Sequence, residues 1–254
     1  MLARRSFVKS FAGLPLAAVL ANPTLARAAA DSLQSVTIET GRGRTVSASL
    51  ALPARTPAPA LILVHEWWGL NDQIKAVAAE FAQQGYVALA IDLYKGEVAT
   101  TPGGARSLMG RVSVEEGIDT STSWAAWLQQ HDAGNGKLGT VGWCFGGGWS
   151  LTTSLKHPVD ATVVYYGRVA GLPEELSALK GPVMGHYATR DNWINKEMVG
   201  SFEEAMKEAG QPFVSHWYEA DHAFANPSGG RYDEADAKLA WERTLAFYAE
   251  HLKS

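Results

Sequence analysis

The chain has a single cysteine, Cys144, and it lies in a segment that could present a nucleophile. It is the centre of Gly142-Trp143-Cys144-Phe145-Gly146, with a glycine two residues away on either side. A nucleophile between a strand and a helix sits on a cramped turn, where flanking side chains would collide with neighbouring backbone. The N-terminus of the following helix stabilises negative charge on the sulfur or on a developing oxyanion. The pattern predicts a thiol nucleophile; the alternative is a glycine-rich turn with an inert, buried cysteine.

A thiol nucleophile needs a base, and the base needs an acid that orients it. In this arrangement the acid and then the histidine follow the nucleophile along the chain, each on a loop after a late strand. Asp191 and His222 each follow a short apolar run, and His222 alone among the seven histidines meets this condition. Asp221 is a rival acid, but adjacent side chains rarely face each other. We therefore predict a triad of Cys144, His222 and Asp191.

Alternating strand and helix patterns position these residues. Residues 60–64 form an apolar run typical of a buried parallel strand, and 86–91 are predicted to be the next buried strand. Further strands are predicted at 137–141, 161–166, 182–187 and 213–218. Two further strands are predicted at 36–40 and 45–52, and helices at 74–81, 104–131, 148–156, 196–209 and 241–252. This order predicts a single α/β domain, with a mainly parallel sheet and helices on both faces. The carboxyl ends of its strands would gather the three triad residues at one edge.

The first thirty residues have the composition of an export signal. Arg4-Arg5-Ser6-Phe7-Val8-Lys9 precedes an apolar run over residues 11–21, and Ala26-Arg27-Ala28 offers small residues for cleavage. A run of about eleven residues is too short to span a bilayer, which needs roughly 20. The paired arginines resemble the twin-arginine signal, whose machinery exports folded proteins. We expect residues 1–30 to be removed, with cleavage near 28–30, and residues 31–254 to form the mature domain in the periplasm or outside the cell.

The composition and net charge of the chain exclude several classes of protein function. Hydrophobic residues make up 46% of the chain and charged residues 19%, which is enough apolar material for a sizeable core. The formal net charge is -4, and loss of the four basic residues in the leader would make it -8. Such a charge argues against a nucleic-acid partner. One cysteine excludes an internal disulfide and a multi-cysteine metal site. We expect no metal, no organic cofactor and no membrane contact in the mature form.

Beyond the triad, the chain resembles the dienelactone hydrolase family of the α/β-hydrolase fold. The resemblance covers most of residues 60–250. It is carried by His65-Glu66-Trp67-Trp68-Gly69-Leu70-Asn71, Gly85-Tyr86-Val87, Asp92-Leu93-Tyr94, Gly142-Trp143-Cys144-Phe145-Gly146-Gly147, Tyr165-Tyr166-Gly167, His216-Trp217-Tyr218 and His222-Ala223-Phe224-Ala225. It implies cleavage of a small carboxylic ester or lactone (carboxymethylenebutenolidase type, EC 3.1.1) through an acyl-enzyme on the cysteine.

The resemblance also implies roles for residues around the thiol. Glu66 corresponds to the family's glutamate, which partners the resting thiol and helps to generate the thiolate. The backbone N–H groups of Trp67 and Phe145 correspond to the oxyanion hole, in agreement with the general rule for this turn. Trp68 and Trp193 are candidate substrate contacts. Trp143, Trp149 and Phe224 also lie near the site in sequence, where tryptophans line pockets and pack in cores equally often.

The substrate anchors depart from the family pattern. The family holds a substrate carboxylate with two arginines, and one of these positions is Asn226 here. Arg106 is the candidate for the other, with Arg111 a weaker one. An amide cannot replace the charge and the two-pronged geometry of a guanidinium. A standard dienelactone is therefore not the expected substrate.

Two other function classes stay open at this level. A lone cysteine in an exported chain could belong to a periplasmic thiol redox protein, although no second cysteine is present to resolve an oxidised form. The altered anchors could instead indicate a non-catalytic ligand-binding module on the same fold.

Overall fold

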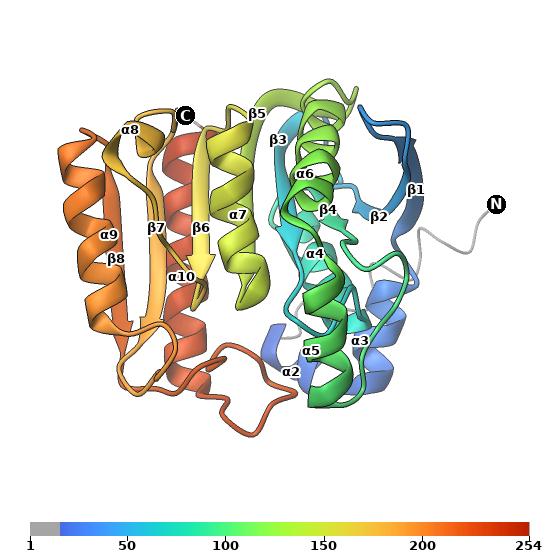
Figure 1. Ribbon diagram of the computed structural model, residues 1–254. Coiled ribbons are helices and arrows are strands. Elements are labelled where there is room, and N and C mark those ends of the chain that lie inside the picture. Colours follow the sequence, from blue (N-terminus) through green and yellow to red (C-terminus); the bar gives the residue numbers. More distant parts are fainter. Residues whose placement is uncertain (1–15, 254) are drawn as a thin grey trace.

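The centre of the molecule is one eight-stranded sheet, which a computed structural model describes together with its helices over residues 16–253 (Figure 1). The strand order is β1-β2-β4-β3-β5-β6-β7-β8. The strands are β1 (Gln34–Glu39), β2 (Thr45–Ala51), β3 (Ala58–Val64), β4 (Val87–Ile91), β5 (Gly134–Trp143), β6 (Ala161–Tyr165), β7 (Val183–Ala188) and β8 (Phe213–Tyr218). β2 pairs antiparallel with β1 and β4, and every pair from β4 to β8 is parallel. The predicted mainly parallel α/β sheet is confirmed.

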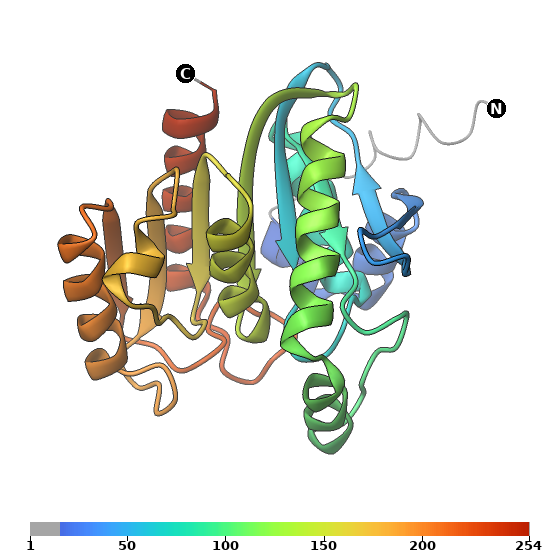
Figure 2. The same cartoon turned by 45° about the horizontal axis from the view of Figure 1, so that its top comes forward.

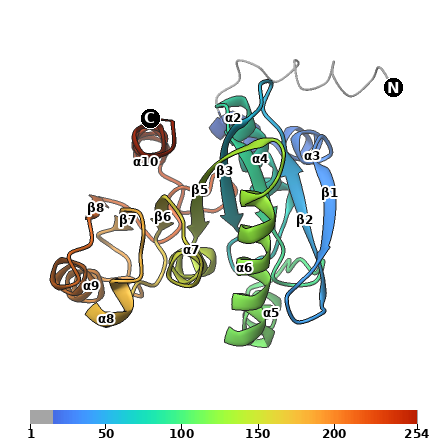
Figure 3. The same cartoon turned by 90° about the horizontal axis from the view of Figure 1, so that it is seen from above.

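Helices cover both faces of the sheet, as Figure 3 shows along the strands. One face carries α2 (Leu16–Ala21), α3 (Pro23–Ala30), α4 (Asp72–Gln83) and α10 (Glu234–Leu252). The other carries α5 (Pro102–Arg111), α6 (Val114–Gln129), α7 (Phe145–Lys156), α8 (Pro173–Leu176) and α9 (Lys196–Glu208). β3 and β4 are buried along their whole length because both faces are covered, which explains their uninterrupted apolar runs.

Helix α7 begins at Phe145, three residues before the predicted start at residue 148. The sequence pattern placed Gly146 and Gly147 in the turn, because glycine disfavours helices. In the structure the helix runs so close to the sheet that a Cβ on Gly146 would overlap the carbonyl oxygens of Val64 and His65. The glycine is required by this approach, which places the first turn of α7 against the end of β3.

Buried hydroxyl groups fix α7 to the sheet. Thr140 Oγ1 on β5 lies 3.0 Å from both Ser150 Oγ and Ser154 Oγ on α7. Ser150 donates to the carbonyl of Val163 at 3.0 Å, and Thr162 donates to Ser154 at 2.6 Å. Because each buried hydroxyl has a partner, the contacts avoid a desolvation cost and are directional. They define how α7 sits on β5 and β6.

The predicted long helix over residues 104–131 is two helices, α5 and α6. Backbone at Val112 is extended, and Ser113 caps α6 by accepting a hydrogen bond from the amide of Glu116 at 3.1 Å. The serine followed three residues later by glutamate is a helix-start signal, which the weak apolar pattern of this stretch obscured. In Figure 2, α5 extends below the end of the sheet.

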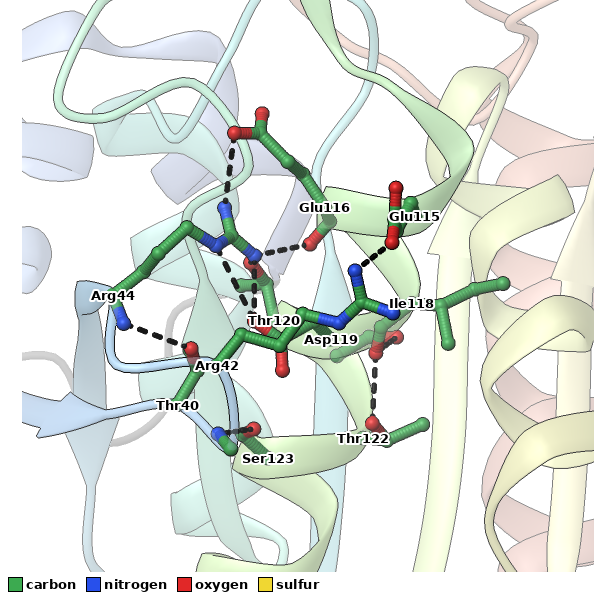
Figure 4. Close-up of polar contacts among 12 residues, drawn as sticks. Thr40, Arg42, Arg44, Glu115, Glu116, Ile118, Asp119, Thr120, Thr122 and Ser123 are labelled. Atoms are coloured by element: carbon green, nitrogen blue, oxygen red, sulfur yellow. Dashed lines mark hydrogen bonds and ion pairs between the residues drawn. The ribbon is translucent and has the colours of Figure 1, made fainter.

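The turn between β1 and β2 is bound to the start of α6 through Arg44 (Figure 4). Its guanidinium donates to Asp119 Oδ2 at 2.9 Å and to the carbonyl of Glu116 at 2.8 Å. The side chains of Arg44 and Asp119 are 26% and 9% exposed. Arg42 in the same turn pairs with Glu115, but both of these side chains are more than half exposed. Arg44 also lies 3.6 Å from the Glu116 carboxylate, so the turn has a sheltered arginine with two acidic partners and a second arginine whose ion pair is in solvent.

Helices α2 and α3 belong to the segment predicted to be an export signal. Asn22 caps α3, and Val19, Ala26 and Ala29 are buried in the apolar cluster that includes α4. The predicted cleavage region therefore coincides with the buried end of α3. The paired arginines and the first part of the predicted apolar run fall in residues 1–15, outside the described residues. Within residues 16–253, no helix is long and apolar enough to cross a membrane.

Candidate active site

The carboxyl edge of the sheet gathers the three predicted triad residues. Cys144 follows β5 at the start of α7, Asp191 follows β7 and His222 follows β8. Cys144 has a left-handed backbone with φ 54°, which is a strained conformation for a residue with a side chain. A Cβ on Gly142 would overlap the carbonyl of Gly146. The glycines two residues before and after Cys144 thus have the steric role that their spacing predicted.

The three side chains form a continuous chain of contacts. His222 Nε2 lies 3.2 Å from Cys144 Sγ, and His222 Nδ1 lies 2.5 Å from Asp191 Oδ2. The other oxygen of Asp191 accepts the amides of Trp193 at 2.8 Å and Ile194 at 3.1 Å. Burial would raise the pKa of the Asp191 carboxyl, but His222 and the two amides outweigh it and hold that pKa below its usual value. The arrangement suits an ionised acid that orients an imidazole toward a nucleophile.

The rival acid, Asp221, faces away from this chain. Its carboxylate accepts from Arg190 at 3.3 Å, and both side chains are about half exposed. Adjacent residues in the loop after β8 thus point in different directions.

Cys144 is held as a neutral thiol. Burial and the nearby Glu66 carboxylate raise its pKa to about 12, although the backbone N–H groups of Phe145 and Trp67 act in the opposite direction. The sequence pattern had suggested that the start of α7 would stabilise negative charge on the sulfur. The amides do so, but desolvation and a like charge outweigh them. The same two N–H groups are the predicted oxyanion hole.

A buried histidine fixes the loop that carries the Trp67 amide. His65 Nε2 accepts the amide of Leu93 at 3.2 Å, so Nδ1 carries the proton and donates to the carbonyl of Glu66 at 2.6 Å. His65 is fully buried, and burial lowers its pKa, which keeps the ring neutral. It bridges the ends of β3 and β4. The sequence reasoning gave it no role, although its place directly after β3 was a usable signal.

Glu66 has different partners from those that the family resemblance implied. Its carboxylate accepts from Tyr166 Oη at 3.3 Å and from Asn226 Nδ2 at 2.6 Å. Cys144 instead has its short side-chain contact with His222. Burial raises the pKa of Glu66, while Asn226, His222 and Tyr166 partly offset it. The implied pairing of Glu66 with the resting thiol is not the arrangement in this structure, because amide and phenol donors occupy the carboxylate.

Asn226 is a buried part of this network, although it also lines the pocket beside the triad. While Nδ2 donates to Glu66, its Oδ1 accepts from Gln73 Nε2 at 2.8 Å and from Ser228 Oγ at 2.6 Å. Only 5% of the residue is exposed. Tyr166 and Gln73 were missed at the sequence level. Tyr166 directly follows β6, so the strand-end rule that found Asp191 could also have found it.

The triad opens into a large and mainly apolar pocket of about 910 Å³. Its wall includes four of the predicted aromatic residues, which are Trp67, Trp68, Trp149 and Trp193. Trp193 is 62% exposed, and its ring lies edge-on to His222 at 5.2 Å. Trp143 and Phe224 are instead packed in the core. The volume is at the upper end of the range for sites that enclose drug-sized ligands.

Three arginines line the pocket. Arg106 is there as predicted, whereas Arg111 pairs with Glu97 at 2.9 Å and does not line it. Arg168 and Arg231 were missed because both lie on loops without a periodic pattern. Arg231 stacks over Trp193 at 5.7 Å. Within residues 16–253, none of the three pocket arginines has an acidic partner.

Comparisons with known proteins find a matching family model, similar sequences and similar folds. A model of the dienelactone hydrolase family matches residues 46–252. The carboxymethylenebutenolidase of Pseudomonas putida is 30% identical over 230 residues, covering 85% of this chain and 96% of that relative. A solved structure assigned as a dienelactone hydrolase, from Klebsiella pneumoniae, has a TM-score of 0.76 and 27% identity, covering 86% of this chain and 99% of that one. A dienelactone hydrolase-like promiscuous phosphotriesterase from metagenomic libraries shares the fold, with a TM-score of 0.78 at 18% identity and coverage of 87% and 99%.

Proposed function

The chain belongs to the dienelactone hydrolase family, and on that premise we propose that it hydrolyses a carboxylic ester or lactone with Cys144 as the nucleophile. One observation carries the proposal. It is the unbroken series of contacts from Cys144 Sγ through His222 to the buried Asp191, at the base of an apolar pocket.

In the proposed reaction, Cys144 Sγ attacks the substrate carbonyl while His222 Nε2 takes the thiol proton. The N–H groups of Trp67 and Phe145 stabilise the oxyanion. Collapse of this intermediate breaks the ester C–O bond, and His222 returns its proton to the leaving alcohol. Water, deprotonated by His222, then attacks the thioester and releases the acid and the free thiol. Asp191 stays ionised and orients the imidazole throughout.

The raised pKa of the Cys144 thiol determines when the thiol loses its proton in this mechanism. A resting thiolate would be almost absent at neutral pH, since the pKa of Cys144 is about 12. Proton transfer to His222 must therefore accompany attack on the carbonyl rather than precede substrate binding. This protects the single thiol from other electrophiles, because reactivity of a cysteine follows its thiolate fraction.

The test is hydrolysis of p-nitrophenyl acetate by the wild type, Cys144→Ala and Cys144→Ser, with circular dichroism to check folding. Cys144→Ala should have no turnover, and mass spectrometry of briefly mixed wild-type protein should find one acetyl group on Cys144. Wild-type rates in Cys144→Ala would overturn the mechanism. A panel of esters and lactones, with and without a carboxylate, then ranks the substrates.

We further propose that a compact dienelactone is not the preferred substrate. Asn226, at one family anchor position, lacks a charge and has its amide bound to Glu66. One N–H of this amide is already used by Glu66, and an amide cannot supply the charge and the two-pronged geometry with which an arginine holds a carboxylate. In the substrate panel, any advantage of a carboxylated lactone over a neutral ester of similar size should therefore come from the pocket arginines, Arg106, Arg168 and Arg231, and not from Asn226.

We also propose export by the twin-arginine machinery, with a site of action in the periplasm or outside the cell. The support is the paired arginines, the short apolar run and the small residues near Ala28. Replacing both arginines, Arg4→Lys with Arg5→Lys, should retain the protein in the cytoplasm on fractionation. Continued export of the double variant would contradict the proposal.

A further inference from the structure

The pocket extends well beyond the reacting atoms along one face of α7. Its wall includes Phe145, Gly148, Thr152 and Leu155. These positions are spaced at three, seven and ten residues from the first, so they share one side of the helix. At 1.5 Å per residue the stripe is roughly 15 Å long. It begins at the residue whose N–H belongs to the proposed oxyanion hole.

This stripe offers a ligand almost no hydrogen-bonding groups. The Thr152 hydroxyl donates to the carbonyl of Gly148 at 2.8 Å and is therefore already used within the helix. Gly148 contributes no side chain, and a Cβ there would lie 3.3 Å from the carbonyl of Arg168. The absence of a side chain at Gly148 keeps the groove open midway along its length. Met109 on α5 faces the same pocket and is 36% exposed.

From this shape we propose, on the basis of the hydrolase function above, that the substrate is an ester with a long, extended apolar chain that lies along α7. A compact lactone would fill only the end of the pocket near Cys144 and leave the apolar stripe in water. An extended chain covers Phe145, Thr152 and Leu155 in turn. Burial of apolar surface then supplies the binding that a carboxylate anchor supplies elsewhere. Each methylene buried in the groove should raise kcat/KM roughly two- to fourfold.

The experiment measures kcat/KM for p-nitrophenyl acetate, butyrate, octanoate and decanoate below their aggregation concentrations. The wild type should prefer the long acyl chains. Thr152→Phe on α7 and Met109→Trp on α5 should each lower the decanoate-to-acetate ratio of kcat/KM by roughly tenfold or more. Ser107→Phe adds the same bulk on α5 at an exposed residue that does not line the pocket, so it should keep the wild-type ratio. A wild type that prefers acetate, or blocking variants that leave the ratio unchanged, would overturn the inference.

Binding without turnover separates this inference from the proposed mechanism. Isothermal titration of 1-decanol into Cys144→Ala should show binding, and adding Thr152→Phe should weaken it roughly tenfold. If decanol binds in this way but no ester is cleaved by the wild type, the hydrolase mechanism fails and the groove stands. If the wild type cleaves esters but Thr152→Phe leaves the affinity for decanol unchanged, the assignment of the groove is wrong and the hydrolase mechanism still holds.

Discussion

The side-chain amide of Asn226 lies 2.6 Å from a carboxylate oxygen of Glu66, and both residues are buried. This contact joins a position where the family places a substrate-binding arginine to one where it places a thiol-activating glutamate. Here the two residues satisfy each other, and Gln73 and Ser228 complete the network from the other side of the amide. The side-chain contact of the Cys144 thiol is therefore with His222 and not with Glu66.

Removing the amide should therefore affect stability before it affects substrate choice. Asn226→Ala removes a donor from a buried carboxylate, which should raise the pKa of Glu66, since this hydrogen bond lowers it. The free energy of unfolding should fall by about 1–3 kcal/mol, measured in urea. Ser228→Ala removes a contact at an exposed residue and should cost less. Unchanged stability, with a higher KM for negatively charged esters only, would instead make Asn226 a substrate contact.

Asp191 and Asp221, the two candidate acids of the triad, should differ sharply in how much their substitution lowers kcat. Asp191→Asn removes the negative charge that orients His222, and kcat should fall by about 10³- to 10⁴-fold. Asp221→Asn changes an acid paired with Arg190 in solvent and should leave kcat within about twofold. Steady-state kinetics with p-nitrophenyl acetate compares them. A large loss of kcat in Asp221→Asn with little loss in Asp191→Asn would show that the acid has been assigned to the wrong residue.

The resting thiol should be slow to react with iodoacetamide. An ordinary cysteine is half ionised near pH 8.5, whereas the pKa of Cys144 is about 12, so its alkylation rate should still be rising at pH 10. Glu66→Gln removes a negative charge that raises this pKa, and should speed alkylation at every pH below it. The urea-unfolded chain is the control, because its one cysteine should titrate near 8.5. A plateau near pH 8.5 in the folded protein would contradict the structure.

The two ion pairs of the β1–β2 turn offer a matched test of burial. Arg44→Ala leaves Asp119 and the Glu116 carbonyl without a sheltered donor and should cost about 1–2 kcal/mol of unfolding free energy. Arg42→Ala removes an exposed pair two residues away and should cost at most about 0.5 kcal/mol.

The loss of unfolding free energy caused by Arg44→Ala should depend on pH. Burial would raise the pKa of Asp119, but Thr40 and Arg44 lower it below its usual value. A lowered carboxyl pKa stabilises the fold above the unfolded pKa near 3.9 and loses that contribution as pH falls through the folded value. The difference between Arg44→Ala and wild type in urea should thus shrink below pH 4. A difference that is constant from pH 7 to pH 3 would mean that the charge of Asp119 is irrelevant.

Sequence could locate Cys144, Asp191 and His222 because the fold fixes where strand ends meet, and each residue lies in the segment that follows the end of a parallel strand. It could not supply the partners of Glu66. Asn226 lies on the irregular loop after β8, whose conformation follows no periodic pattern, and its contact with Gln73 in the first turn of α4 joins residues 153 positions apart. The start of α7 was placed too late for a related reason. Helix propensity disfavours glycine, and only the close approach to Val64 and His65 explains its use there.

The crowding around Gly142 and Gly146 has a consequence for how such an enzyme can acquire new activities. No side chain fits at either position without displacing backbone, and Cys144 between them is already strained. A mutant library selected on unfamiliar esters should therefore leave both glycines untouched and accumulate changes at Thr152 and Met109. New substrate preferences should therefore arise from substitutions in the groove wall, while the turn that carries Cys144 keeps its sequence.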